Sequence, residues 1–420
     1  MTVADRSDEV DIATEWPEWF ELLDLVGRVE PGVDITWSEE LGVWLSGSYR
    51  GFRRIADDPD LFQFPGRNAE LAPPWLDRDF YIWFEGGPKK FQFTEGEEHA
   101  RLHRWWMNQF SPKQVGEWRE HVIQPLIGEL IDGFADAGSA DLMADFARRL
   151  PLPVMLRMME IPADGELMER YLAVGNEFGD LRWKLLSKPA DDELRARATE
   201  VSLEMRALLM PYLDARRSGD GDDLISRLWR ATPDLIDGEI NDDAMYANLT
   251  TLFEAGVGTG AGAIGDVLYV LMKFPDYQQR LREDPSLVPN FVEEALRLMM
   301  PGSYIIRQLR EDTEFFGETL RRGQSIIGVS VAAGRDSGQY QCPHQIDLTR
   351  KGPRNHVAFS WGPRACVGHA IGRAELQEVT AAITARLADL RLDPDQPRPM
   401  RAGAGARRPW DRLPALFTAL

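Results

Sequence analysis

The residues best suited to chemistry in this chain surround one cysteine. Cys366 lies in the sequence Phe359-Ser-Trp-Gly362-Pro-Arg364-Ala-Cys366-Val-Gly368, directly before a segment with helical apolar spacing. A cysteine ahead of a helix N-terminus meets unsatisfied amides and a positive partial charge, which favour the thiolate. The two glycines let the backbone approach a flat ligand closely, and Arg364 could hold an acidic group of that ligand. A metal-ligating thiolate and a buried structural cysteine are the two interpretations.

The full pattern Phe-x-x-Gly-x-Arg-x-Cys-x-Gly fixes five positions and is expected by chance at roughly one in ten thousand in a chain this long. It resembles the haem loop of the cytochrome P450 family. The resemblance implies that Cys366 is the proximal thiolate ligand of the iron in haem b (heme b, iron protoporphyrin IX), with Gly368 bordering the cofactor. Such a thiolate donates electron density and favours cleavage of the O–O bond. Cys342 has no comparable context, and we expect it to be inert.

A second unusual segment spans residues 250–263, Thr-Thr-Leu-Phe-Glu-Ala-Gly-Val-Gly-Thr-Gly-Ala-Gly-Ala. Gly258-x-Gly260-x-x-Ala263 satisfies the dinucleotide-binding fingerprint, but that fingerprint needs a preceding strand and a βαβ unit. The preceding apolar residues have helical spacing and no buried strand follows, so we reject a nucleotide site. Each glycine inside a helix costs up to about 1 kcal/mol of helix stability relative to alanine. Four glycines in seven residues therefore conflict with the expected helix, and a conflict between local preference and fold is typical of functional sites.

The family resemblance extends to this segment, where cytochromes P450 carry an Ala/Gly-Gly-x-Asp/Glu-Thr motif. Ala255, Gly256 and Thr259 match it, whereas Gly258 replaces the acid. The resemblance implies that the Thr259 hydroxyl positions dioxygen and water, and we expect it also to bond a carbonyl one turn back. Protons must then come from water, the substrate or another group. Glu254, one turn before Gly258, is our candidate for a proton relay or a substrate contact; the alternative is an exposed glutamate.

Further motifs concern the haem propionates. His99-Ala-Arg101-Leu-His103-Arg104 is similar to the family's His-x-Arg-x-Arg helix, with His103 where the last arginine is normal. Either His103 binds a propionate as a neutral ring or Arg104 reaches round to it. The propionate partners implied by the resemblance are His99, His103 or Arg104, Arg307, His356 and Arg364.

Two other segments match proximal elements of the family. Glu294 and Arg297 match its Glu-x-x-Arg pair, which implies a buried structural brace; taken alone, this spacing indicates a surface ion pair. Ala332-Ala-Gly-Arg-Asp336 is similar to the family's Ala-Asn-Arg-Asp segment, with Gly334 replacing asparagine.

Aromatic residues crowd the segment 75–93, for which core packing is the simplest interpretation. By resemblance, the segment precedes the propionate helix and caps the distal pocket. Basic residues are sparse among these positions, which predicts a compact, largely apolar pocket and disfavours a strongly anionic substrate. The residues expected to face substrate are Trp75, Phe80, Tyr81, Phe84, Thr251, Ala255, Ile305 and Ile306.

These residues must be positioned by a mainly helical framework. Apolar spacing is helical over much of 113–300, and the absence of proline from 234 to 274 leaves room for one long helix. Short strands broken by glycine turns are expected across 303–331, and a further helix over 368–390. We predict a mainly α fold with a small β-sheet region, formed by residues 1–420 as a single cytochrome P450 domain with haem between the long distal helix and the cysteine-loop helix.

Composition excludes several other classes of protein. The 420 residues are 44% hydrophobic and 28% charged, as in globular proteins with a sizeable core. A net charge of −20 disfavours a nucleic-acid partner. The sequence contains no run of 18 apolar residues, the length that would predict a membrane span. Two cysteines and no hydrophobic leader indicate a reduced, cytoplasmic protein.

The resemblance implies a soluble bacterial-type monooxygenase that inserts one oxygen atom from O2 into an apolar organic substrate by hydroxylation or O-dealkylation. Because no nicotinamide or flavin segment is present, electrons must come from separate proteins, by default a ferredoxin and its reductase; we expect a monomer. The basic residues expected to receive an acidic ferredoxin are Arg101, Arg104, Lys113 and Arg364. The alternatives are a peroxide-using or partner-independent haem-thiolate enzyme, and a non-enzymatic haem-binding protein. Thr259 argues against both, because neither requires it.

Overall fold

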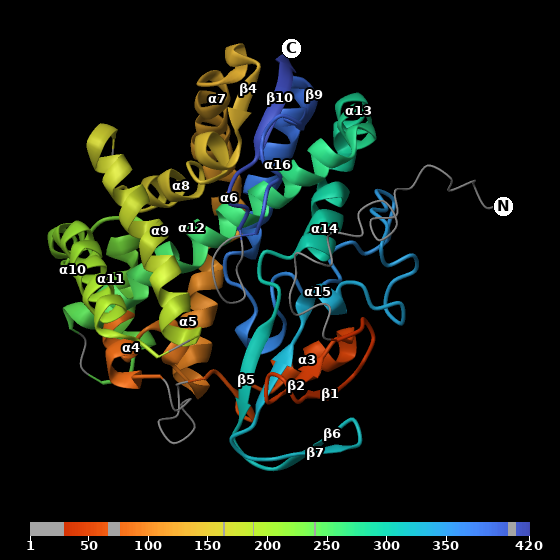
Figure 1. Cartoon of the computed structure of the whole chain (residues 1–420). Helices are drawn as coiled ribbons and strands as arrows, with labels where there is room; N and C mark the ends of the chain where they lie inside the picture. Colours follow the sequence, from red (N-terminus) through yellow and green to blue (C-terminus); the bar gives the residue numbers. More distant parts are fainter. Residues whose placement is uncertain (1–28, 66–75, 163, 188, 239–240, 402–408) are drawn as a thin grey trace.

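A computed structural model describes residues 29–65, 76–162, 164–187, 189–238, 241–401 and 409–420. Figure 1 shows helices making up most of the molecule, with α9, α10 and α11 gathered on one side and the strands β1, β2 and β5 on another. The α-helices of the described residues are α3 (Tyr49–Asp57), α4 (Arg78–Phe84), α5 (Gly96–Gln109), α6 (Pro112–Trp118), α7 (Gln124–Asp132), α8 (Pro151–Met158), α9 (Gly165–Ser187), α10 (Asp192–Ala215), α11 (Leu224–Leu235), α12 (Asp242–Lys273), α13 (Pro275–Glu283), α14 (Val288–Met299), α15 (Ser330–Ala333) and α16 (His369–Arg386). Short helical turns are η3 (Phe91–Phe93), η4 (Arg119–Ile123), η5 (Ala135–Ala137), η6 (Met143–Ala147), η7 (Pro285–Leu287) and η8 (Gly362–Arg364).

Three small sheets accompany the helices. The largest has the order β1-β2-β8-β5-β3; β2 pairs parallel with β8, and β5 pairs antiparallel with both β8 and β3. The strands are β1 (Thr36–Ser38), β2 (Val43–Ser46), β3 (Phe62–Gln63), β4 (Ser139–Asp141), β5 (Ile305–Leu309), β6 (Thr313–Phe315), β7 (Glu318–Leu320), β8 (Ser325–Gly328), β9 (Leu387–Leu392) and β10 (Pro414–Ala419). The predicted mainly α fold with small sheets is confirmed. The strand expected to reach residue 331 instead ends at Gly328, because α15 begins at Ser330.

The long helix α12 is the core of the fold, and its ends follow from local chemistry. The Asn241 side chain accepts the amide of Ala244, acids occupy the first turn, and Lys273 lies in the last turn, which complements the helix dipole. The helix ends before Pro275, as residues preceding proline disfavour the helical conformation. In the described chain, α12 is the one helix long and apolar enough to cross a membrane, but 72% of its most apolar window is buried inside the protein. It is therefore a core helix.

Glycines let neighbouring elements approach α12 closely. A Cβ at Gly256 would lie 2.7 Å from the sulfur of Met155 in α8, and one at Gly265 would lie 2.6 Å from that of Met143 in η6. The rejected dinucleotide fingerprint lies wholly within this helix, without the strand it would need. Close packing therefore accounts for Gly256 and Gly265, but not for Gly258, whose Cβ would meet nothing within 4 Å among the described residues.

Candidate active site

The cysteine loop is a tight turn that ends at the N-terminus of α16, a helix packed against α12. Gly362 has a φ of +70°, and a Cβ there would lie 2.8 Å from the backbone oxygen of Ala56, so only glycine fits. The amide of Cys366 donates to the carbonyl of Phe359 (2.8 Å). The Cys366 side chain is exposed, two residues before Gly368, the N-cap of α16. The thiol is therefore accessible at a helix N-terminus, where a thiolate is favoured.

Two side-chain hydrogen bonds hold this loop to other elements. Nε2 of His103 bonds the carbonyl of Ala365 (2.9 Å), and Nη2 of Arg364 donates to the carbonyl of Thr94 (2.7 Å). Arg104, by contrast, is exposed. The structure therefore brings His103 rather than Arg104 to the cysteine loop, where the ring supports the backbone immediately before the cysteine.

His99 lies on α5, one turn before His103. Its ring stacks on Phe91 (4.7 Å between centroids), and Nδ1 lies 3.4 Å from the carbonyl of Phe91. Nε2 is buried and has no hydrogen-bond partner in the described chain. Burial, with the nearby charge of Arg364, lowers the pKa of His99 to about 3, so the ring is neutral at pH 7. A buried, unsatisfied ring nitrogen is costly. Nε2 would donate to a carboxylate in the tautomer that carries the proton on Nε2, with Nδ1 accepting from the Thr94 hydroxyl 3.3 Å away.

Arg307 and His356, the two other proposed propionate partners, differ in their burial and in their hydrogen bonds. Arg307 is half-buried on β5, and its Nη1 donates to the carbonyl of Ile306 (2.8 Å). His356 is buried, with Nε2 bonded to a carboxylate oxygen of Glu293 (2.9 Å) and Nδ1 accepting the amide of Ala358 (3.2 Å). Both ring nitrogens of His356 therefore have protein partners, because buried Glu293 requires donors. This corrects the prediction for His356, which we remove from the propionate set.

One face of α12 borders open space. Ala255 and Gly258 are exposed although most of the helix is buried, and a Cβ at Gly258 would meet no described residue within 4 Å. The hydroxyl of Thr259 is buried and makes no hydrogen bond in the described chain. The expected bond to a carbonyl one turn back is therefore absent, which leaves the hydroxyl available to a bound molecule.

Glu254 is buried, and its Oε1 lies 3.0 Å from Nη1 of Arg182 on α9. The alternative of an exposed glutamate is therefore wrong. Arg182 and Lys90 are buried as well, and each pairs with a carboxylate of Glu85. An acid inside an apolar helix signals that a buried cation must compensate it, but the sequence does not show which cation.

The residues expected to face substrate fall into two groups. Phe84 is fully buried and stacks on Phe178 (4.4 Å), which places it in the core rather than at a pocket surface. Tyr81 is also buried, and Thr251 is buried with its hydroxyl donating to a backbone carbonyl (3.1 Å). Trp75 lies outside the described residues. Those that retain exposed surface are Phe80, Ala255, Ile305 and Ile306.

The Glu294–Arg297 pair is fully buried and joined by two hydrogen bonds of 2.8 and 2.9 Å. Arg297 also donates to the carbonyls of Gly334 (2.7 Å) and Pro343 (2.6 Å). A Cβ at Gly334 would lie 2.2 Å from the carbonyl oxygen of Arg297. The close approach of the two backbones explains why glycine replaces the asparagine of the family pattern.

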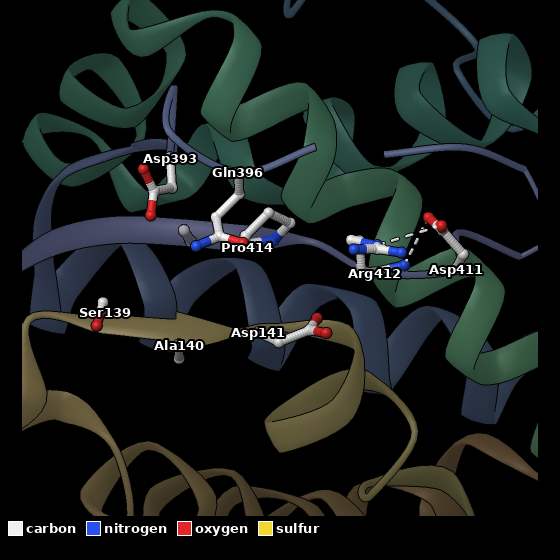
Figure 2. Close-up of a pocket in the computed structure, with 9 residues that line it drawn as sticks. Ser139, Ala140, Asp141, Asp393, Gln396, Asp411, Arg412 and Pro414 are labelled. Atoms are coloured by element: carbon white, nitrogen blue, oxygen red, sulfur yellow. Dashed lines mark hydrogen bonds and ion pairs between the residues drawn. The ribbon is translucent and has the colours of Figure 1, made fainter. Parts of the chain in front are cut away.

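A separate pocket of about 450 Å³ lies on the three-stranded sheet β4-β10-β9. Figure 2 shows the acidic side chains of this pocket, of which Asp411 pairs with Arg412 (3.3 Å). Asp141 accepts the amides of Met143 (3.0 Å) and Leu413 (2.8 Å). These acids therefore serve backbone and ion-pair contacts, and none of the predicted site residues that the structure describes lines the pocket.

The accessible cysteine at a helix N-terminus, the neutral buried histidine and the small-residue face of a central helix define a site of the haem-thiolate class. The cytochrome P450 family model matches residues 212–403. The 6-deoxyerythronolide B hydroxylase of Saccharopolyspora erythraea is 30% identical over 81% of this chain and 80% of its own length. Nocardicin C N-oxygenase of Nocardia uniformis is 31% identical over 74% and 75%.

Solved structures agree on the fold. The crystal structure of CalO2 superposes with a TM-score of 0.81, at 24% identity, over 100% of this chain and 99% of that one. This chain belongs to the cytochrome P450 family, and it is a monooxygenase-type oxidoreductase of bacterial type.

The cofactor of this family is haem, and the residues present fit it. The exposed thiol of Cys366 can supply the iron ligand, and the unsatisfied Nε2 of buried His99 suits a propionate. The open space beside Gly258 and the unsatisfied hydroxyl of Thr259 suit a molecule bound on the distal side.

Proposed function

We propose that this chain uses haem b to insert one oxygen atom from O2 into a small or medium-sized organic substrate with an apolar body, by hydroxylation or O-dealkylation. Hydroxylation is the reaction in the names of two relatives, 6-deoxyerythronolide B hydroxylase and mycinamicin VIII C21 methyl hydroxylase. The observation that carries the proposal is a pair of buried polar atoms, Nε2 of His99 and Oγ1 of Thr259, that make no hydrogen bond to any residue that the structure describes. They occur together with an accessible thiol at Cys366.

Haem held by Cys366 would supply electron transfer and oxygen activation. In this proposal His99, Arg307 and Arg364 hold the propionates, and His103 fixes the cysteine loop through the Ala365 carbonyl. The hydroxyl of Thr259 holds a hydrogen-bonding position on the distal side.

We propose Glu254 as the group that moves protons toward Thr259, because Gly258 carries no acid. The carboxylate of Glu254 is buried and lies one turn before Gly258 on α12. A positioned general acid contributes about 10²–10⁴-fold to a proton transfer. In the absence of an acid at position 258, Glu254 is the nearest acidic residue on this helix.

The experiment compares Glu254→Gln with Asp243→Asn, an exposed acid in the first turn of the same helix. A screen of aromatic and terpenoid compounds for spin-state shifts first identifies a binding compound. Glu254→Gln should retain that shift but form at least tenfold less product per NADPH consumed, whereas Asp243→Asn should match the wild type. Unchanged coupling in Glu254→Gln would remove this residue from the relay.

A second candidate function is peroxide-driven oxidation, which Gly258 favours because it removes the usual acid of the motif. Peroxide carries its own protons and electrons, so an enzyme that uses it needs neither a relay nor a reductase. Turnover with hydrogen peroxide that equals turnover with NADPH, ferredoxin and reductase would support this candidate.

We further propose that the chain acts as a monomer with a ferredoxin and its reductase. Lys113 is highly exposed, with one ion pair of 3.9 Å to the half-exposed Glu117, and Arg104 is exposed, so both can contact an acidic partner. Arg101 forms a shorter ion pair with Asp237 (2.6 Å). Arg364 donates to the carbonyl of Thr94 (2.7 Å). Lys113→Glu should therefore weaken ferredoxin binding at low salt, whereas an unchanged ferredoxin KM would exclude this contact.

A further inference from the structure

Four charged side chains form a buried cluster beside α12, made of Glu85, Lys90, Arg182 and Glu254. Nε of Arg182 donates to Glu85 (2.7 Å), and its Nη1 lies 3.0 Å from Glu254. Lys90 pairs with the other carboxylate oxygen of Glu85. The two acids and two cations cancel, so the cluster carries no net charge.

The cluster joins three segments that are distant in the sequence, around residues 85–90, 182 and 254. Glu85 is the C-cap of α4 and Lys90 is the N-cap of η3, while Arg182 belongs to α9 and Glu254 to α12. Of the two cations, Arg182 is the one whose contacts reach both acids. Although burial opposes its charge, Glu254 and Glu85 raise the pKa of Arg182, so it remains a cation.

The segment 85–94 extends from this cluster to the residues proposed to hold the haem propionates. Phe91 stacks on His99, and Oγ1 of Thr94 lies 3.3 Å from Nδ1 of that ring. The carbonyl of Thr94 accepts Nη2 of Arg364 (2.7 Å). One end of this short segment therefore contacts the buried charges, and the other end contacts His99 and Arg364.

We propose that Arg182 is a positioning residue that ties the segment 85–94, and through it His99 and Arg364, to Glu254 on α12. The guanidinium of Arg182 thereby links the propionate side of the site to its distal side. A planar guanidinium with several donors can bridge two carboxylates, whereas a lysine ammonium is a single point of contact. This inference goes beyond the proposed function, because it concerns how the site is held and not what it oxidises.

The test compares Arg182→Met, Arg182→Lys and a matched control, Arg170→Met, which removes an exposed ion pair from the same helix. Amide hydrogen exchange is measured on the haem-loaded proteins. Exchange in the segment 85–94 should be at least tenfold faster in Arg182→Met, intermediate in Arg182→Lys and unchanged in Arg170→Met. The variant should fold, because Asn248 on α12 still donates to the Lys89 carbonyl (2.9 Å).

The double variant Arg182→Met/Glu254→Gln separates positioning from simple stabilisation. It removes a buried cation and a buried anion together, so it should recover much of the thermal stability lost in Arg182→Met. Exchange in 85–94 should nevertheless stay fast, because Glu85 still lacks its bond to Arg182. Recovery of slow exchange in the double variant, or uniformly faster exchange throughout Arg182→Met, would overturn the proposal.

A second measurement examines the link from segment 85–94 to His99 and Arg364. The rate at which haem transfers from each variant to apomyoglobin should rise several-fold in Arg182→Met and remain at the wild-type value in Arg170→Met. Equal transfer rates in all variants would overturn the link to His99 and Arg364. Hydrogen exchange on the protein as purified tests the tie even if the proposed oxidation reaction fails.

Discussion

A single buried carboxyl should make the stability of this protein depend on pH. Glu375 on α16 is 7% exposed, and no hydrogen bond or ion pair in the described chain reaches it. Its Oε2 lies 3.7 Å from the Cβ position of Gly260 on α12. Burial raises the pKa of Glu375 from 4.5 to about 8. The folded protein therefore retains this proton at pH values where the unfolded chain loses it.

The sign and size of the effect follow from linkage. The folded state is favoured below pH 4.5, and this contribution is lost as the pH rises towards about 8. At about 1.36 kcal/mol per pH unit, the loss between pH 5 and pH 7 is about 2.5 kcal/mol. For a chain of this length, an unfolding entropy of about 2 cal/mol/K per residue converts that loss to about 3 °C in Tm.

The assay is scanning calorimetry of the wild type and Glu375→Gln at one scan rate from pH 5 to pH 8. The Tm of the variant relative to the wild type should rise by about 3 °C from pH 5 to pH 7. The exposed control Glu193→Gln should run parallel to the wild type over this range. Parallel curves for Glu375→Gln would refute the reasoning, because they would mean that the carboxyl ionises as freely in the folded state as in the unfolded chain.

Three further predictions concern the site and its supports. Thr259→Ala should retain the substrate-induced spin-state shift but form at least tenfold less product per NADPH; unchanged coupling would contradict the role of its hydroxyl. Gly258→Asp should fold with a Tm within about 3 °C of wild type, because its Cβ meets nothing within 4 Å, and should restore coupling to Glu254→Gln. Glu294→Gln leaves Arg297 buried beside a neutral partner and should cost about 3–5 kcal/mol of stability, seen as loss of soluble haem-loaded protein. Normal yields of that variant would contradict a structural role.

Local patterns in the sequence account for most of the framework. The limits of α12 follow from the Asn241 cap and from Pro275, both of which act within a few residues. The turn before Cys366 likewise depends on Gly362, whose position in the motif is local. Such features are predictable because their causes lie near them in the chain.

The predictions that the structure corrects depend mainly on contacts between residues distant in the sequence. His356 is separated by 63 residues from Glu293, the carboxylate that takes its Nε2, and no local pattern indicates that pairing. Arg182 is similarly remote in the sequence from both Glu85 and Glu254, so no local pattern predicts the buried charge cluster. The expected bond of Thr259 was reasonable from helix geometry, but Thr259 shows no such bond, whereas Thr251 on the same helix makes it.

The most direct test of the account is the carbon monoxide difference spectrum of the dithionite-reduced protein. Ligation of haem iron by the Cys366 thiolate predicts the red-shifted Soret band of a thiolate-bound ferrous carbonyl, and Cys366→Ser should lose that band. A carbonyl spectrum without the red shift, or no haem bound after reconstitution, would contradict the assignment of this chain as a haem-thiolate monooxygenase.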